Sequence, residues 1–570
     1  MPASKYICAN WSPDRTDCKK QGTKACKNCL LVVYCDQACQ TFHWPTHRSA
    51  CRSPLGKTTW QPGWILENRA PSFIGGGMAE QFGAKKYLWG NVPAFDILRL
   101  GSNEGAEYGR GVSILCAASG DIRNIVNTIA QLPTSYRHSL RLVINDRDFD
   151  IVARNIILLL IALVVEEVDE AVDCMIHLWY SAFVRKSDTE IIRGQVRPLI
   201  ESVCEKVKNK PPQTLLGKTW QFGRQSLRVV LQKSSWDRLL ALFDAPSGLT
   251  AERAHQIRTA ITLAESRRDY RERHMCFQSP PHRVAFERFR ADGLLLPFGY
   301  PRHEFQEPNL SFFQNAHHTW PMPDSADPLH GWPSEDVANT SSGAATADIY
   351  GKLFFYLQGT LRTFLDRLSS LDVSFRLFQV DASDLPQYVE KDSFSRIEVS
   401  NISDAGWLGI HRTLYLMVPL LETPLDNPHA TLITLFMNAV EETLTGQDKI
   451  HILTADRIAK ERLLKYLPPK PGLAFKYSPW ILKLTAGQDL VTTYDHIFDR
   501  YSKWFMFSEA PLFEAAMKEN HTVIDKWPYR LKRRPGQPGA QEEFDRQLGS
   551  GVSSKERYME WRRLYQTSMV

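Results

Sequence analysis

The stretch "GVSILCAASGDIRNIVNTIAQL", residues 111–132, holds an apolar run, a short polar turn and a second run with a different period. The first run, residues 112–117, predicts a buried β-strand. Ser119, Gly120 and Asp121 predict a tight turn after it. Four apolar residues then recur at helical spacing: Ile122, Ile125, Val126 and Ile129. The stretch is typical of a strand–turn–helix unit in an α/β protein.

The same pattern returns on both sides of a long interruption. Residues 140–163 predict a strand, a polar turn at Asn145 and Asp146, and a long apolar helix. Three more apolar runs follow much later, within residues 374–386, 394–404 and 429–442. Consecutive strand–helix units predict a parallel sheet with right-handed crossovers. We therefore expect one α/β core whose two halves come together across a mostly helical insertion.

The insertion, residues 166–370, ends in an irregular part crowded with aromatic and proline residues. A structureless loop of that length is uncommon in a compact domain. We expect its large side chains to pack on the core: Phe305, Phe312, Phe313, Trp320 and Trp332. The longest apolar run, residues 156–165, is shorter than the roughly 20 residues that a membrane span needs. We interpret this run as a core helix and expect no membrane partner.

Cysteine is concentrated in the first 51 residues, which hold seven of the eleven cysteines. The chain opens with polar residues and shows no signal peptide, so we expect the cytoplasm or the nucleus, where disulfides are disfavoured. Metal binding is then the favoured interpretation, and a redox-active thiol cluster is the alternative. Eight side chains could fill two closed tetrahedral zinc sites: Cys8, Cys18, Cys26, Cys29, Cys35, Cys39, His47 and Cys51.

Residues 26–51, "CKNCLLVVYCDQACQTFHWPTHRSAC", resemble a MYND-type zinc finger in the spacing of their cysteines and histidine. The wider gap between Cys8 and Cys18 departs from the family pattern. His43 falls off the family spacing and is expected at the surface. The resemblance implies two interleaved zinc ions, one bound by Cys8, Cys18, Cys35 and Cys39 and the other by Cys26, Cys29, His47 and Cys51.

The same resemblance implies a protein partner, because MYND fingers bind short proline-containing peptides. Gln40 and Trp44 are then the candidate peptide-binding residues, since an indole can pack on a proline ring. Packing within the helix of the finger is the alternative role for both side chains. Nucleic acid is not indicated, because this type of finger lacks a basic recognition helix and the net charge is only +6 over 570 residues.

A second resemblance covers "WGNVPAFDILRLGSNEG" (89–105), "SILCAASGDIRNIVNTI" (113–129), "LVINDRDFDIVARNIILL" (142–159) and "RIEVSNISDAGWLG" (396–409). These stretches resemble a domain shared by fungal-type MYND-finger proteins and the dynein axonemal assembly factor family. The resemblance implies a Rossmann or methyltransferase-like doubly wound sheet, split here by the long helical insertion.

In such a sheet the cofactor binds at the carboxyl ends of the strands. S-adenosylmethionine would then contact Gly120, Asp146 and Asp381. Alanine and serine occupy positions in the first turn where a working site has glycines, which argues against catalysis. Helix capping is the alternative role for Asp121 and Asp146. The arginine-rich residues 265–277 predict a solvated helix face, with substrate binding as the alternative.

Two functions remain. The first is a zinc-binding, non-catalytic adaptor that mediates protein–protein interaction or assembly; the second is an S-adenosylmethionine-dependent methyltransferase. The sequence leans toward the first. The expected parts are a MYND finger (1–52), a linker (53–86), the first half of the α/β core (87–165), a mostly helical insertion (166–370), the second half of the core (371–470) and a C-terminal helical extension (471–570).

Overall fold

The computed structural model describes residues 6–11, 18, 20–74, 81–313, 319–454, 457–469, 476–506 and 509–565. Its largest sheet has nine strands in the order β12-β13-β11-β10-β3-β4-β9-β7-β6. These strands are β3 (Val112–Cys116), β4 (Leu140–Asn145), β6 (Leu215–Phe222), β7 (Gln225–Gln232), β9 (Val373–Phe378), β10 (Arg396–Glu398), β11 (Thr431–Phe436), β12 (Ala515–Met517) and β13 (Arg557–Arg563).

The centre of this sheet is parallel. The strands β11, β10, β3, β4, β9 and β7 run in one direction, whereas β13 is antiparallel to β11 and β6 is antiparallel to β7. The first core strand, β3, lies between β4 and β10, and Leu115 is paired with Ile397. Segments before and after the insertion therefore form one mixed α/β sheet, which confirms the expected joining of the two halves.

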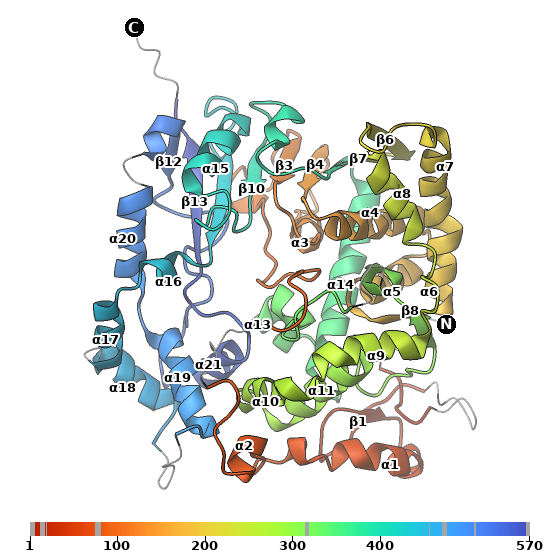
Figure 1. The fold of residues 1–570 in the computed structure, drawn as a ribbon, viewed down its shortest axis with the longest axis vertical. Helices are drawn as coiled ribbons and strands as arrows, with labels where there is room; N and C mark the ends of the chain where they lie inside the picture. Colours follow the sequence, from red (N-terminus) through yellow and green to blue (C-terminus); the bar gives the residue numbers. More distant parts are fainter. Residues whose placement is uncertain are drawn as a thin grey trace.

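Helices surround the sheet and build the rest of the molecule (Figure 1). α14 packs on α3 and α5. The helices are α1 (Gln37–Cys51), α2 (Gly63–Leu66), α3 (Arg123–Gln131), α4 (Phe149–Val164), α5 (Val168–Tyr180), α6 (Lys186–Ile191), α7 (Arg197–Val207), α8 (Lys233–Ala241), α9 (Ala251–Thr262), α10 (Arg268–Cys276), α11 (Pro280–Asp292), α12 (Leu310–Phe313), α13 (Ser334–Asn339), α14 (Ile349–Ser370), α15 (Ile410–Met417), α16 (Ala439–Thr443), α17 (Gly446–Thr454), α18 (Arg457–Tyr466), α19 (Pro479–Val491), α20 (Asp495–Phe505) and α21 (Ala540–Leu548).

Two segments that we expected to be helical also supply strands to the large sheet. The insertion contributes the hairpin β6–β7, and residues 471–570 contribute β12 and β13. The strand β13, "RYMEWRR", is hard to predict from sequence because some of its charged side chains are buried in the structure. Glu560 is fully buried and accepts hydrogen bonds from the backbone N–H groups of Thr522, Val523 and Ile524. A run with this much charge does not predict an interior strand.

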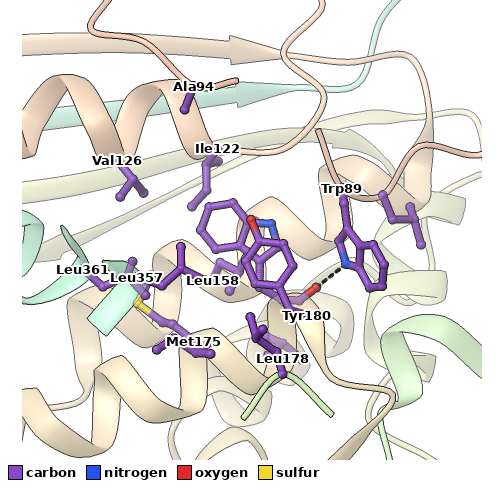
Figure 2. Packing of buried hydrophobic residues seen from close by; sticks show 14 of the residues in the cluster. Trp89, Ala94, Ile122, Val126, Leu158, Met175, Leu178, Tyr180, Leu357 and Leu361 are labelled. Atoms are coloured by element: carbon purple, nitrogen blue, oxygen red, sulfur yellow. Dashed lines mark hydrogen bonds between the residues drawn. The ribbon is translucent and has the colours of Figure 1, made fainter. Parts of the chain in front are cut away.

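The aromatic part of the insertion packs as expected. Phe305, Phe312, Phe313, Trp320 and Trp332 are all buried. Figure 2 shows Tyr180 between Ile122 and Leu178, with Trp89 beside it; the centroids of the Trp89 and Tyr180 rings are 5.9 Å apart. The apolar run in α4 is also buried, as a core helix should be. Among the described helices, none combines the length and the apolar character that crossing a bilayer requires.

Candidate zinc centres and strand-end site

The amino-terminal residues form a small ββα unit. β1 (Lys24–Ala25) pairs antiparallel with β2 (Val33–Tyr34), and α1 follows. Between the strands the chain turns back at Leu30, which adopts a left-handed conformation (φ 56°) and donates its N–H to the carbonyl of Cys26. Asp36 caps α1 by accepting the N–H of Cys39 at 2.8 Å. The turn and the cap bring cysteines from both ends of the unit together.

Eight cysteine and histidine side chains converge in two groups of four. The first is Cys8, Cys18, Cys35 and Cys39, and the second is Cys26, Cys29, His47 and Cys51. Within each group the possible ligand atoms all lie within 4.8 Å of one another. In the second group the Sγ atoms of Cys26 and Cys51 are 3.6 Å apart, and Cys29 Sγ is 3.4 Å from His47 Nε2. The sets are those implied by the resemblance to MYND fingers.

The donor chemistry of both groups fits zinc. Four ligands around one zinc at about 2.3 Å would place neighbouring sulfurs roughly 3.8 Å apart. The Sγ atom of Cys35 lies 3.6 Å from that of Cys18 and 3.4 Å from that of Cys39, close to this spacing. Burial raises the pKa of Cys29, so its thiolate needs a nearby cation. Burial also lowers the pKa of His47 to about 4, which keeps the imidazole in its neutral, ligating form.

The side chains predicted to bind a peptide lie on α1. Gln40 and Trp44 are both half-buried. The guanidinium of Arg52 lies 5.4 Å from the centroid of the Trp44 ring, which also meets His47 edge-on. Trp44 therefore covers the second ligand group and keeps part of its surface accessible. His43 belongs to neither group, and its Nδ1 atom lies 3.0 Å from the hydroxyl of Tyr34.

The finger is packed on the insertion. Trp11 donates its indole N–H to the carbonyl of Gly299 at 2.9 Å, and Ala347 donates its N–H to the carbonyl of Leu30 at 3.2 Å. Buried finger residues belong to the same apolar cluster as the core. Figure 1 shows the finger at the lower edge of the molecule, next to α11 and far from β3 and β4. Finger and core are thus one packed body with two separate candidate sites.

The turn after β3 is held by the protein itself. Gly120 has a left-handed backbone (φ 56°) and donates its N–H to Asp146 Oδ2 at 3.0 Å. The other oxygen of Asp146 accepts the N–H of Asp148 at 2.9 Å. Asn155 also donates its side-chain amide to the carbonyl of Gly120 at 2.8 Å. The structure thus brings Gly120 and Asp146 together, but the carboxylate already holds two backbone donors.

Asp381 and Asp404 take different places at this edge of the sheet. Asp381 is exposed and accepts the N–H of Ser383 at 2.9 Å. Asp404 is buried, and its carboxylate accepts the N–H of Met437 at 3.1 Å, so it ties the loop after β10 to the loop after β11. Burial raises its pKa to about 6. No contact between Asp381 and the pair Gly120–Asp146 is found in the described chain.

A structural role also accounts for Asp121, which lies next to the turn. Its carboxylate accepts the N–H of Gly90 at 2.9 Å and pairs with the guanidinium of Arg123 at 2.5 Å. The indole of Trp179 donates to the same carboxylate at 3.3 Å. A Cβ atom on Gly90 would lie only 2.0 Å from that guanidinium, so this position needs glycine. Two of the stretches that carry the resemblance, residues 89–105 and 113–129, are thus in direct contact through Gly90 and Asp121.

A second contact of this kind joins residues 89–105 to another resembling stretch, residues 396–409. Arg396 of β10 is fully buried and forms two hydrogen bonds of 2.8 Å with the carboxylate of Glu104. Sequence reasoning missed this pair, because nothing in the local pattern around either residue signals a partner nearly three hundred positions away. The one hint in the sequence was that two stretches resembling the same family each contain a charged residue, of opposite sign.

Three cavities of about 820, 470 and 510 Å³ lie among the described residues, and Gly120, Asp146 and Asp381 line none of them. The 470 Å³ cavity separates α1 from α11 and includes His43 and His47 in its lining. The 510 Å³ cavity is lined by side chains from residues 265–277, including Arg271 and Arg273. That segment was expected to form a solvated helix face; Arg267 is buried in it and other arginines line the cavity.

Comparison with known proteins identifies two regions of the chain. Residues 16–51 match the MYND finger family, and residues 88–184 match a family described as a domain of unknown function, DUF4470. No solved structure matches the chain. Cys8 precedes the matched finger, so its place in the first group rests on the geometry. The protein thus carries a zinc-binding MYND finger, a type of module that generally mediates protein interactions, and a DUF4470 domain that spans β3 to β5 (Phe183–Arg185).

Proposed function

We propose that this protein is a non-catalytic adaptor that recruits a partner protein through its MYND finger. The observation that carries the proposal is the pair of complete four-ligand groups. A zinc ion with four protein ligands has no open position for water or substrate, so it organises a binding surface and does not activate a reactant. Zinc bound there would hold α1 and the β1–β2 hairpin in one fixed arrangement.

The proposed binding surface is the accessible side of α1 around Gln40 and Trp44. An indole held by a zinc ligand and an arginine is a rigid apolar face, and such a face suits a proline ring. The partner would then present a short proline-containing segment. Thiolate ligands require a reducing compartment, and the proposal therefore implies the cytoplasm or the nucleus.

The α/β core would act as a scaffold. Its stretches that resemble the dynein axonemal assembly factor family and fungal-type MYND proteins support an assembly role. The alanine and serine in the turn after β3, at positions where a working cofactor site has glycines, support the absence of catalysis.

The test is binding to a displayed library of proline-containing peptides. Zinc-loaded full-length protein should enrich a peptide class, and Trp44→Ala should weaken binding of the enriched peptides at least tenfold. Phe42→Ala is the matched control, since Phe42 is exposed on the same helix and belongs to neither ligand group. Both variants should retain two equivalents of zinc. Equal binding by wild type and Trp44→Ala would remove the assigned surface.

The second candidate, an S-adenosylmethionine-dependent methyltransferase, is favoured by one observation. If the core strands β3, β4, β9, β10 and β11 are numbered 1 to 5 along the chain, their order across the sheet, from β9 to β11, is 3-2-1-4-5. This is the order of doubly wound nucleotide-binding sheets. Calorimetric titration with S-adenosylmethionine discriminates the two. Binding that Asp146→Asn abolishes would favour the enzyme; no heat at millimolar cofactor would leave the adaptor.

A further inference from the structure

The 510 Å³ cavity lies at the carboxyl edge of the large sheet. Met437, which lines it, directly follows β11, and Glu556 directly precedes the antiparallel strand β13. Gly90, another lining residue, donates to Asp121 in the turn after β3. Ligands of open α/β sheets bind outside this edge. The volume is within the range of small-molecule sites, roughly 300–1,000 Å³.

Four arginines line this cavity: Arg267, Arg271, Arg273 and Arg290. Two of them have structural acidic partners. Arg267 pairs with Asp324 at 2.8 Å, and its guanidinium lies 3.4 Å over the ring of Tyr270. Arg290 is buried and reaches Asp327 at 4.0 Å, a distance that makes this pair weak. The Nε atom of Arg290 is buried and makes no hydrogen bond within the described chain.

The other two arginines, Arg271 and Arg273, have no carboxylate within ion-pair distance in the described chain. Arg271 donates to the carbonyl of Ala264 at 2.6 Å, and Arg273 lies 5.2 Å from the ring centroid of Phe73. Burial lowers the pKa of both guanidiniums; the carboxylates of Glu287, Glu265 and Asp324 oppose this at Arg271 without reversing it. The protein therefore holds two half-buried guanidiniums next to a cavity, and among the described residues no carboxylate is in ion-pair contact with either.

None of the acids that line the cavity forms an ion pair with Arg271 or Arg273. Asp324 is taken by Arg267, and Asp327 accepts hydrogen bonds from Tyr350 Oη at 2.7 Å and from the N–H of Leu329 at 3.0 Å. Glu556 accepts the N–H of Ser553 at 2.9 Å through Oε1, and its Oε2 is buried and makes no hydrogen bond within the described chain. Counting side chains that carry full charge, four arginines face three carboxylates. An anion is the ligand that would complete this site.

We propose that this cavity binds a small oxyanion-bearing molecule through Arg271 and Arg273. The planar fork of an arginine matches a phosphate or a carboxylate with two parallel N–H bonds. The inference goes beyond the adaptor role, because it gives the α/β core a ligand of its own. It is also separate from the cofactor position at Gly120 and Asp146, neither of which lines the cavity.

The test is isothermal titration of the zinc-loaded full chain at constant ionic strength. Pyrophosphate serves as the phosphate probe and citrate as the carboxylate probe. We expect one of the two to bind at micromolar to millimolar concentration, and the probe that binds identifies the chemistry of the anion. Arg271→Gln and Arg273→Gln should each weaken its binding at least tenfold.

Arg268→Gln is the matched control. Arg268 lies on the same helix, α10, but pairs with Glu272 and does not line the cavity. It should leave the affinity within twofold of wild type. Arg273→Gln is the informative variant if Arg271→Gln disturbs folding, because Arg273 makes no hydrogen bond within the described chain; circular dichroism and the melting temperature check both. Absence of binding by both probes at 10 mM, or an affinity that neither variant changes, would overturn the proposal.

Discussion

The finger and the α/β core are stabilised in opposite ways. The finger has two two-residue strands and one helix, and its centre consists of eight ligand side chains. The core buries a continuous apolar cluster and adds ion pairs between residues far apart in sequence, such as Arg396 with Glu104. A small unit that cannot bury enough apolar surface depends on metal, whereas a large one depends on its packing. Four experiments test this difference.

Removal of zinc should have the largest effect. With a high-affinity chelator under reducing conditions, we expect residues 20–51 to lose amide protection while β3 and β4 keep theirs. Structural zinc contributes on the order of 10–16 kcal/mol to the folding of small fingers. Hydrogen exchange followed by mass spectrometry measures both regions in one sample. Retained protection of the finger without zinc would show that its packing on α11 holds it instead.

Next in size is the loss of a buried ion pair in the core. Glu104→Gln leaves the fully buried guanidinium of Arg396 without its charge partner, so we expect a loss of about 3–5 kcal/mol in the free energy of unfolding. Asp169→Asn is the control: it removes the exposed pair with Arg362 and should cost at most about 1 kcal/mol. Urea titration measures both, and zinc content should stay at two equivalents in both. A loss below about 1 kcal/mol in Glu104→Gln would contradict this account.

A smaller effect should depend on pH. Burial raises the pKa of Glu398, at the end of β10, from 4.5 to about 7. An acid with a raised folded pKa stabilises the fold fully below pH 4.5 and loses that contribution as pH rises toward 7. At ~1.4 kcal/mol per pH unit, the free energy of unfolding of Glu398→Gln should rise by about 3 kcal/mol relative to that of wild type between pH 5 and pH 8.

The comparison between Glu398→Gln and wild type cancels any effect of pH on the finger, since both proteins carry the same zinc ligands. Urea titrations at pH 5, 6.5 and 8 provide the measurement. A constant difference between the two proteins across this range would mean that Glu398 does not change its protonation there.

The smallest effect concerns the turn after β3. Gly120 has φ 56°, and a Cβ atom there would meet no other atom within 4 Å. Gly120→Ala should therefore cost about 1 kcal/mol through backbone strain alone. Gly194→Ala is the control, because Gly194 also has open space but lies in a helical segment without positive φ, so alanine should be neutral or stabilising there. Thermal unfolding ranks the two, and a cost above about 3 kcal/mol at Gly120 would indicate a contact not seen here.

The contrast also explains what could be predicted from the sequence. The eight ligands were predictable, because metal coordination imposes short and fixed spacings on the chain, and the resemblance to MYND fingers implied their division into two groups. The strands β3, β4, β9, β10 and β11 were also predictable from their apolar runs. The hairpin β6–β7 and the strands β12 and β13 were not, because their residues alternate or carry charges whose partners lie elsewhere. The buried carboxylate of Glu560, held by three backbone N–H groups, is the clearest case.

The candidate site of the core shows the same limit. The sequence predicted Asp146 near Gly120 but could not show that each oxygen of its carboxylate accepts a backbone N–H. Residues 265–277 contain four arginines, but the sequence could not show which of them lack carboxylate partners. Both facts depend on contacts that a local pattern does not reveal. Periodicity finds elements; it does not find the contacts between them.

The position of β13 determines when the large sheet can close during synthesis. This strand lies between β11 and β12 and is reached only after residues 437–556 have been made. Until then β11 has an unpaired edge while the ribosome is still translating, a state open to pairing with other chains. The finger faces no such delay, since its ligands emerge within the first 51 residues and can capture zinc at once. The nascent chain could therefore meet a partner through its finger before its sheet is closed.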